Sequence, residues 1–283
     1  MTAFLALNSA SFAALLFVVA SGFTLIFGLM RIINLAHGAL YLLGGYVGMV
    51  IGVRTGSFTL AVVGASAAVA LVGCLVDVGL LRFVKDNALR QVLLTLGVAI
   101  VLDDIDLVIF GGDTFTMPVP EFLEGPVSLG GMYYPKYRLF VLVAGVVIYA
   151  ALWLLLNRTR LGSLIRAGVD DAEMVDAMGV DIKRLFVCTF MLGCALAGLG
   201  GVMGGAFLTL YPTADSEILV FSLAVVIIGG RGSLLGAAIG SILVGFLATF
   251  GQVWFPEFAY FVIFGPMALL LAFRPLGLFG KAA

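Results

Sequence analysis

Polar residues interrupt two long apolar stretches of the chain, and their side chains are of types that bind a solute through hydrogen bonds and charge. The first interruption reads Asn34-Leu-Ala-His37-Gly38 and the second Gly229-Gly-Arg231-Gly-Ser233. A break of this kind inside a membrane is tolerated only where protein or a water-filled path surrounds the backbone. Interrupted helices in both halves of a chain are typical of a transport pathway. The pathway candidates at the two breaks are Asn34, His37, Gly38, Gly230, Arg231 and Ser233.

His37 is the only histidine of the chain. A single imidazole without a second titratable partner makes a poor proton relay. Asn favours the N-cap position, so we expect Asn34 to cap a helix that begins near Leu35 and to leave His37 in its first turn. The His37 ring then contacts either the backbone or a solute. Both roles stay open, because polar groups inside membranes tend to be functional.

Carboxylates supply the remaining candidates. Asp103 and Asp106 lie late in an apolar segment, where a charge at mid-bilayer costs about 2.5–3.5 kcal/mol. We expect Asp106 at the solvated end of that segment, and Asp103, which lies deeper, to line the path. Asp77 is expected near the inner mouth with Arg82 in reach. Glu217, in a polar connection between apolar segments, belongs either to a hydrated turn or to the place where a polar solute enters.

The sequence carries no enzymatic signature. It lacks the phosphate loop G-x-x-x-x-G-K-[ST] and the zinc motif H-E-x-x-H, and one histidine leaves no credible nucleophile and base pair. Cys74, Cys188 and Cys194 have no C-x-x-C spacing and are expected to be buried free thiols. We therefore expect no catalytic residue, no metal site and no cofactor in this chain. A net charge of −1 offers no basic surface for nucleic acid.

Composition shows which elements must position these residues. With 63% hydrophobic and 11% charged residues, the chain lies far outside the range of soluble domains. We expect an all-α, polytopic transmembrane bundle of eight to nine segments, some of them glycine-interrupted or re-entrant, in a single domain over 1–283. The expected segments are 9–30, 36–53, 58–81, 91–111, 138–157, 185–208, 218–230, 233–250 and 258–274. The least secure of these, and candidates for half-helices, are 36–53, 218–230 and 233–250.

The distribution of basic residues orients the bundle. If every segment crosses, only Arg54, Lys136 and Arg138 of the 15 basic residues face one side. The positive-inside rule then places the N-terminus outside and the C-terminus inside. Residues 112–137 become an external loop whose prolines and glycines exclude a long helix. Residues 158–184 become a cytoplasmic loop.

The cytoplasmic loop contains the signals of a short helix. Asp170 or Asp171 is placed to cap a helix through Ala172–Met178, and Gly179 is placed to end it. We expect the apolar side chains of this helix to be available to a partner protein, because flexible Met side chains suit docking. These side chains are Met174, Val175 and Met178.

Small residues recur every fourth position in three rows. Such rows let helix backbones approach closely inside lipid, so packing is the expected role of most of these glycines. The rows are Gly44, Gly48 and Gly52; Gly193, Ala197, Gly201 and Gly205; and Gly232, Gly236 and Gly240.

Four stretches of the sequence, at 22–48, 93–102, 166–185 and 211–245, resemble the permease family of bacterial ABC importers for branched-chain amino acids, more closely its H-type subunit. The resemblance implies a multi-pass protein of the bacterial inner membrane, in contact with lipid. It implies a second permease subunit (a similar chain or a second copy), two cytoplasmic ATPase subunits that bind ATP and Mg, and a periplasmic solute-binding protein. By position, 166–185 resembles the coupling helix region. The coupling candidates are Arg166, Asp171, Glu173, Met174, Val175, Met178 and Gly179.

The resemblance further implies alternating access driven by the partner ATPases, with no ATP hydrolysis in this chain. The family includes importers of branched-chain and other amino acids, amides, urea and carboxylates. The acidic outer half of the chain favours a zwitterionic or neutral solute. The alternative is a self-sufficient channel or an ion-coupled secondary transporter, which would transport without partners and carry intramembrane carboxylates near the midplane.

Overall fold

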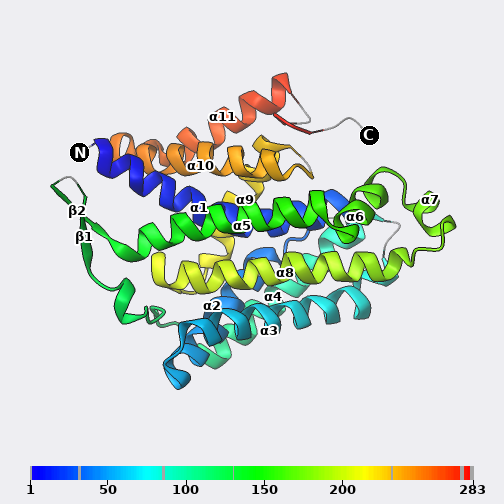
Figure 1. Ribbon diagram of the computed structural model, residues 1–283, viewed down its shortest axis with the longest axis horizontal. Helices are drawn as coiled ribbons and strands as arrows, with labels where there is room; N and C mark the ends of the chain where they lie inside the picture. The colour runs from blue at the N-terminus through cyan, green and yellow to red at the C-terminus, as the bar shows by residue number, and fades with distance from the viewer. Residues whose placement is uncertain are drawn as a thin grey trace.

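The computed structural model describes residues 2–30, 33–84, 87–129, 131–230, 232–274 and 277–280. Helices make up nearly all of it (Figure 1). Those that coincide with the nine expected apolar segments are α1 (Thr2–Met30), α2 (His37–Thr55), α3 (Phe58–Gly79), α4 (Ala88–Phe110), α5 (Lys136–Arg158), α8 (Ile182–Phe207), α9 (Ala214–Gly229), α10 (Leu234–Trp254) and α11 (Ala259–Phe273). The short turns η1 (Leu81–Phe83), η2 (Glu121–Leu123) and η3 (Pro256–Phe258) are 3-10 helices.

Within the described residues, six helices are long and apolar enough to cross a membrane. They are α1, α2, α3, α5, α8 and α10. The 23-residue α4 contains three aspartates, whereas α9 and α11 are only 16 and 15 residues long. The protein is thus an all-helical, multi-pass bundle in which α4, α9 and α11 differ in kind from the rest.

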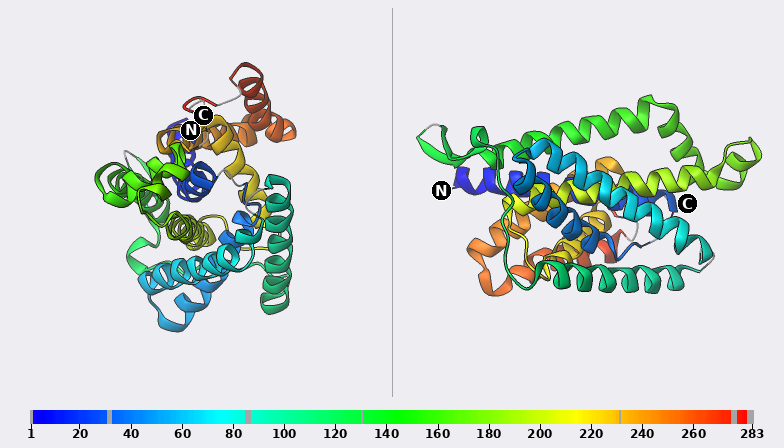
Figure 2. Two further views of the ribbon diagram at one scale, coloured as in Figure 1. Left: turned by 90° about the vertical axis from the view of Figure 1, so that its right-hand side faces the viewer. Right: turned by 90° about the horizontal axis from the view of Figure 1, so that it is seen from below.

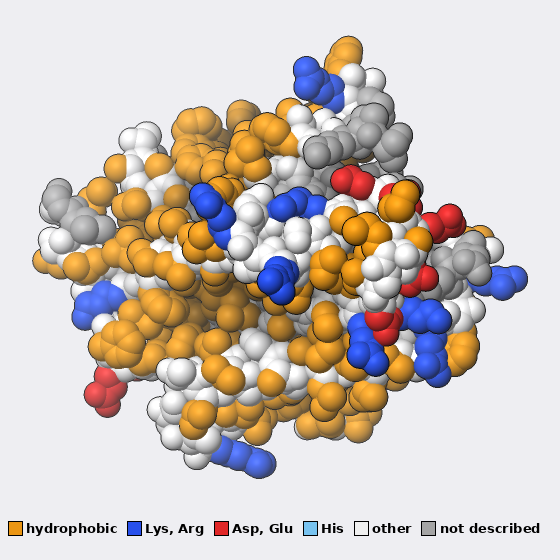
Figure 3. Space-filling model, turned by 45° about the vertical axis from the view of Figure 1, so that its right-hand side comes forward, with side chains coloured by type: hydrophobic (Ala, Val, Ile, Leu, Met, Phe, Trp, Pro, Cys, Tyr) orange, Lys and Arg blue, Asp and Glu red, His pale blue; other side chains and the backbone are white. Residues whose placement is uncertain are grey.

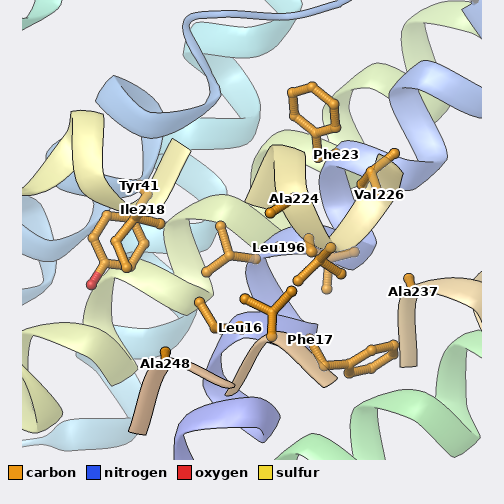
Figure 4. Close-up of a cluster of buried hydrophobic side chains, with 14 of the residues drawn as sticks. Leu16, Phe17, Phe23, Tyr41, Leu196, Ile218, Ala224, Val226, Ala237 and Ala248 are labelled. Atoms are coloured by element: carbon orange, nitrogen blue, oxygen red, sulfur yellow. The ribbon is translucent and has the colours of Figure 1, made fainter. Parts of the chain in front are cut away.

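The helices α1 and α8 form the centre of the bundle (Figure 2). Helix α1 packs on α5, α8, α9 and α10, while α8 also packs on α2 and α3. The largest core cluster joins side chains of α1, α2, α8, α9 and α10, among them Leu16, Tyr41, Leu196 and Ile218 (Figure 4). Hydrophobic side chains cover much of the surface, while most of the acidic side chains in view gather towards one end (Figure 3). An apolar outer surface of this kind suits contact with lipid.

The glycine rows bring helix backbones close together, as expected. A Cβ atom on Gly201 would overlap the carbonyl oxygen of Tyr41, and one on Gly44 would overlap Gly198. In the third row, Gly236 and Gly240 face α9, where Gly236 meets the backbone of Gly229, whereas Gly232 lies against Gly28 of α1. These approaches place α2 on α8 and α10 on α9.

The loop between α4 and α5, which we call the outer loop after its predicted side, contains a small hairpin. Its described residues form no long helix, as its prolines and glycines predicted. Strand β1 (Pro126–Leu129) pairs antiparallel with β2 (Met132–Pro135). Two hydrogen bonds between Phe115 and Leu210, with N to O distances of 2.8 and 2.7 Å, tie the loop to the connection that follows α8.

The loop between α5 and α8, which we call the inner loop after its predicted side, contains two helices, α6 (Arg160–Asp170) and α7 (Ala172–Ala177), where the sequence predicted one. The sequence analysis missed α6, which begins where the Thr159 hydroxyl accepts a hydrogen bond from the Gly162 amide at 3.1 Å. Its Ile165 is buried against Leu185 of α8. The hairpin and α7 lie at opposite ends of the bundle, as do the two ends of the chain (Figures 1 and 2).

Candidate functional site

The break between α1 and α2 is a turn closed by Asn34. Its side chain oxygen accepts a hydrogen bond from the Ala36 amide at 3.2 Å, and its carbonyl accepts one from the His37 amide at 3.2 Å. Helix α2 begins at His37, with Ala36 at the N-cap position and no side chain cap. The prediction that Asn34 caps a helix from near Leu35 is therefore wrong. An Asn side chain that bonds the backbone two residues on forms a turn in place of a cap.

Thr95 of α4 anchors this break, and the sequence analysis did not select it. The Thr95 hydroxyl accepts a hydrogen bond from the Leu35 amide at 3.2 Å and lies 3.3 Å from the Ile33 carbonyl, to which it donates. The partners are about 60 positions apart in the sequence, so no local pattern marks this interaction. Its effect is to fix α4 beside the start of α2.

The His37 ring is fully buried and serves the packing of α1 on α2. Its Nε2 lies 2.9 Å from the Val19 carbonyl, a hydrogen bond in which Nε2–H donates, and Phe23 meets the ring edge to face at 5.3 Å. The other ring nitrogen, Nδ1, has no partner in the described part of the chain. The same holds for the Asn34 amide nitrogen and for the Ser222 hydroxyl of α9. Buried polar atoms left without partners are expected at sites that bind something else.

Gly38 brings the start of α2 directly against the first turn of α9. A Cβ atom at this position would overlap the carbonyl oxygen of Asp215. Helix α9 begins at Ala214, four residues before the expected segment, so Asp215 lies inside a helix and not in a polar turn. The sequence analysis did not select Asp215 as a candidate, although an acid in the first turn of a helix is a recognised signal.

Three carboxyl groups meet beside this helix crossing. Asp103 and Asp106 of α4 lie near enough to Asp215 of α9 for the three charges to act on one another. Asp106 is only 2% exposed, and neither of its carboxyl oxygens has a partner among the described residues. The expectation of a solvated end is therefore wrong for Asp106. Phe110 stacks on Tyr46 with ring centroids 4.3 Å apart and meets Phe115 of the outer loop, and these rings cover the end of α4.

The second break has a structural role in the described residues. Gly230 and Gly232 adopt φ values of +96° and +71°, which favour glycine, and the Ser233 hydroxyl caps α10 by accepting a hydrogen bond from Gly236 at 3.0 Å. Residues 277–280 add backbone hydrogen bonds to the end of α9. Arg231 lies outside the described residues. The structure thus accounts for Gly230 and Ser233 through backbone geometry and capping.

The pattern of the family described as "Branched-chain amino acid transport system / permease component" matches residues 5–271. The chain belongs to this family.

Among its relatives, the high-affinity branched-chain amino acid transport system permease protein BraD of Pseudomonas aeruginosa is 26% identical over 281 residues, which cover 93% of this chain and 91% of BraD. LivH of Escherichia coli K12, with the same description, is 25% identical with the same coverage. The ribose import permease protein RbsC of Escherichia coli K12 is 27% identical over 81% of this chain and 72% of its own length. No solved structure matches. The chain is therefore a transmembrane ABC permease of the branched-chain amino acid type.

In this permease, the short helix of the inner loop forms as its sequence predicted. The Asp171 carboxylate caps α7 by accepting a hydrogen bond from the Met174 amide at 2.9 Å, and Glu173 occupies the first turn. Gly179, with φ +84°, follows the end of the helix. Arg166 donates to the carbonyl of Leu156 and thereby ties α6 to α5.

The apolar side chains of α7 divide into two groups. Met174 and Met178 are 59% and 76% exposed, whereas Val175 is 4% exposed. Val175 is thus wrongly predicted as a docking surface, because it faces the interior and holds α7 in place. Met174 and Met178 together form what we call the methionine face.

Asp77 has Arg82 beside it, as the sequence suggested. Asp77 is buried and lines a cavity of about 340 Å³ together with Arg82 and Lys183. The cysteines differ from expectation, because Cys188 is exposed and Cys74 only half-buried, and only Cys194 is buried. Among the described residues, no three His, Cys, Asp or Glu side chains are placed to hold one metal ion, and this includes Asp103, Asp106 and Asp215.

Proposed function

We propose that this permease is the membrane-spanning subunit of an ABC importer that carries a small amino acid into the cell by alternating access. It would reside in the bacterial inner membrane with its N-terminus outside. Its partners would be a second permease subunit, two cytoplasmic ATPase subunits that hold ATP and Mg, and a periplasmic solute-binding protein. The family match supports the subunit type, and the relatives described as branched-chain amino acid permeases support the solute class.

The observation that carries the coupling proposal is the methionine face. A capped helix that exposes two large apolar side chains at one end of a membrane protein needs a partner to cover them. A ligand or partner shifts a conformational equilibrium only through its different interactions with the two states. Docking of the ATPase subunits on α7 therefore has to be firmer in one state of the bundle than in the other.

The buried carboxyl cluster of Asp103, Asp106 and Asp215 would take part in the gate. Carboxylates that act on one another in a buried region repel unless one of them binds a proton. The start of α2 and the first turn of α9 meet at this cluster, so a change in its charge acts on both helices. The same cluster is the one observation that favours the alternative, an ion-coupled transporter driven by a proton gradient.

The test is the solute dependence of ATP hydrolysis. The permease is reconstituted with its neighbouring gene products, and ATPase activity is measured against a panel of amino acids, amides, urea and carboxylates. We expect stimulation by an amino acid loaded on the binding protein. Hydrolysis that no solute changes would contradict an importer role, and stimulation by a sugar alone would contradict the proposed solute class.

A further inference from the structure

A cavity of about 230 Å³ opens at the hairpin end of the bundle, beside the first turn of α9. Asn8 of α1 and Arg138 of α5 line it, together with Glu217 of α9 and Gln252 of α10. Glu217 and Gln252 are exposed, so the cavity reaches the surface. This is the end that we assign to the outside of the cell, where a solute would arrive.

The cavity contains one charge of each sign, and each is held in place by a neutral neighbour. The Arg138 guanidinium donates to the Asn8 side chain oxygen and lies 4.8 Å from the centre of the Phe207 ring. Tyr211 donates a hydrogen bond to the Glu217 carboxylate at 2.9 Å. Arg138 and Glu217 bind these neutral groups and, within the described part of the chain, form no ion pair of the kind that joins Arg184 to Asp181.

Apolar side chains form the rest of the wall. Phe12 and Phe221, which meet edge to face with ring centroids 5.7 Å apart, line the cavity beside Ile218. Pockets that bind small ligands combine such an apolar lining with a few fixed polar groups. A fixed cation, a fixed anion and an apolar wall together match a molecule with a carboxylate, an ammonium group and an aliphatic side chain.

We infer that this cavity is a recognition site for a zwitterionic amino acid with an apolar side chain, in which Arg138 binds the carboxylate and Glu217 binds the ammonium group. The inference rests on the proposed function and adds a site to it. An anion without an ammonium group would leave Glu217 unpaired, and a cation without a carboxylate would leave Arg138 unpaired. Selectivity therefore arises in the permease itself and not only in a binding protein.

The test uses a cysteine at the cavity wall in the assembled transporter. The variant Gln252→Cys is placed in phosphatidylcholine vesicles, and the rate of its reaction with a thiol reagent is measured. The rate for the parent protein is subtracted as background. Leucine should slow this reaction about tenfold, whereas leucine amide and the deaminated carboxylic acid at equal concentration should not. The control variant Glu124→Cys, on the outer loop and away from the cavity, should react at the same rate throughout.

Two charge substitutions complete the test. Arg138→Gln and Glu217→Gln should each remove the protection by leucine, whereas Arg54→Gln and Glu121→Gln, which alter exposed charges outside the cavity, should keep it. Equal protection by all three compounds, or none by leucine, would overturn the inference. Protection that appears on adding phosphatidylethanolamine alone would also overturn it, because a lipid headgroup then fills the cavity. Stimulated ATP hydrolysis without leucine protection would reject this site and leave the proposed function intact.

Discussion

Single atoms decide how closely the central helices pack. Gly201 lies against the backbone of Tyr41, and Gly38 lies against that of Asp215. In lipid no hydrophobic force drives helices together, so the close van der Waals packing at such glycines is a main source of stability. Asp106 should have the opposite effect and destabilise the fold, because its buried carboxyl oxygens have no partner in the described residues.

Adding one methyl group where α2 meets α8 should destabilise the bundle. Gly201→Ala places a Cβ against the Tyr41 carbonyl, and we expect overpacking to cost about 1–3 kcal/mol. The measurement is the thermal unfolding midpoint of the solubilised protein. Gly97→Ala is the matched control, since nothing lies within 4 Å of its new methyl group. Equal midpoints for the two variants would contradict the described packing.

Removing the unpartnered carboxylate should stabilise the protein. Asp106→Leu deletes a buried polar group that has no partner in the described residues. We therefore expect the free energy of unfolding to rise by about 1–3 kcal/mol. Asp104→Leu, an exposed neighbour on the same helix, should change little. A lower thermal midpoint for Asp106→Leu than for the parent would mean that the carboxylate is satisfied in the folded protein. Uptake should fall in Asp106→Leu if the cluster belongs to the gate.

Elements differ in how far their own sequence determines them. Helix α7 was predictable, because its cap at Asp171 and its stop at Gly179 are local signals. The start of α2 was not, because Asn34 closes a turn that Thr95 of another helix holds in place. The position of the three aspartates depends on how α4 and α9 each pack on α2, which no local pattern encodes.

The methionine face should be needed for ATPase docking and not for folding. Met178→Glu places a charge on a side chain that is 76% exposed, so the bundle should fold while binding of the ATPase subunits weakens about tenfold or more. Copurification of these subunits with the tagged permease measures the effect. Phe122→Glu, on the outer loop and 72% exposed, is the control and should retain them. Full retention by Met178→Glu would place the docking surface elsewhere.

In the proposed mechanism, recognition and energy input occur at different parts of the molecule. The charged cavity lies at the hairpin end, the carboxyl cluster lies where α2, α4 and α9 meet, and the methionine face lies at the far end on α7. Composition and charge distribution were enough to predict a multi-pass helical bundle, because lipid restricts the chain to helices. The cavity was not predictable, since its lining residues come from helices that are distant in the sequence.

In the proposed mechanism, this chain forms the solute path and has no energy source of its own, so other subunits drive its change of conformation. The most direct measurement is amino acid uptake into vesicles. One sample contains the purified permease alone and a proton or sodium gradient, and the other contains the complete assembly and ATP. We predict uptake only in the complete assembly, and only when ATP is hydrolysed. Gradient-driven uptake by the permease alone would contradict the account and would assign the carboxyl cluster to ion coupling.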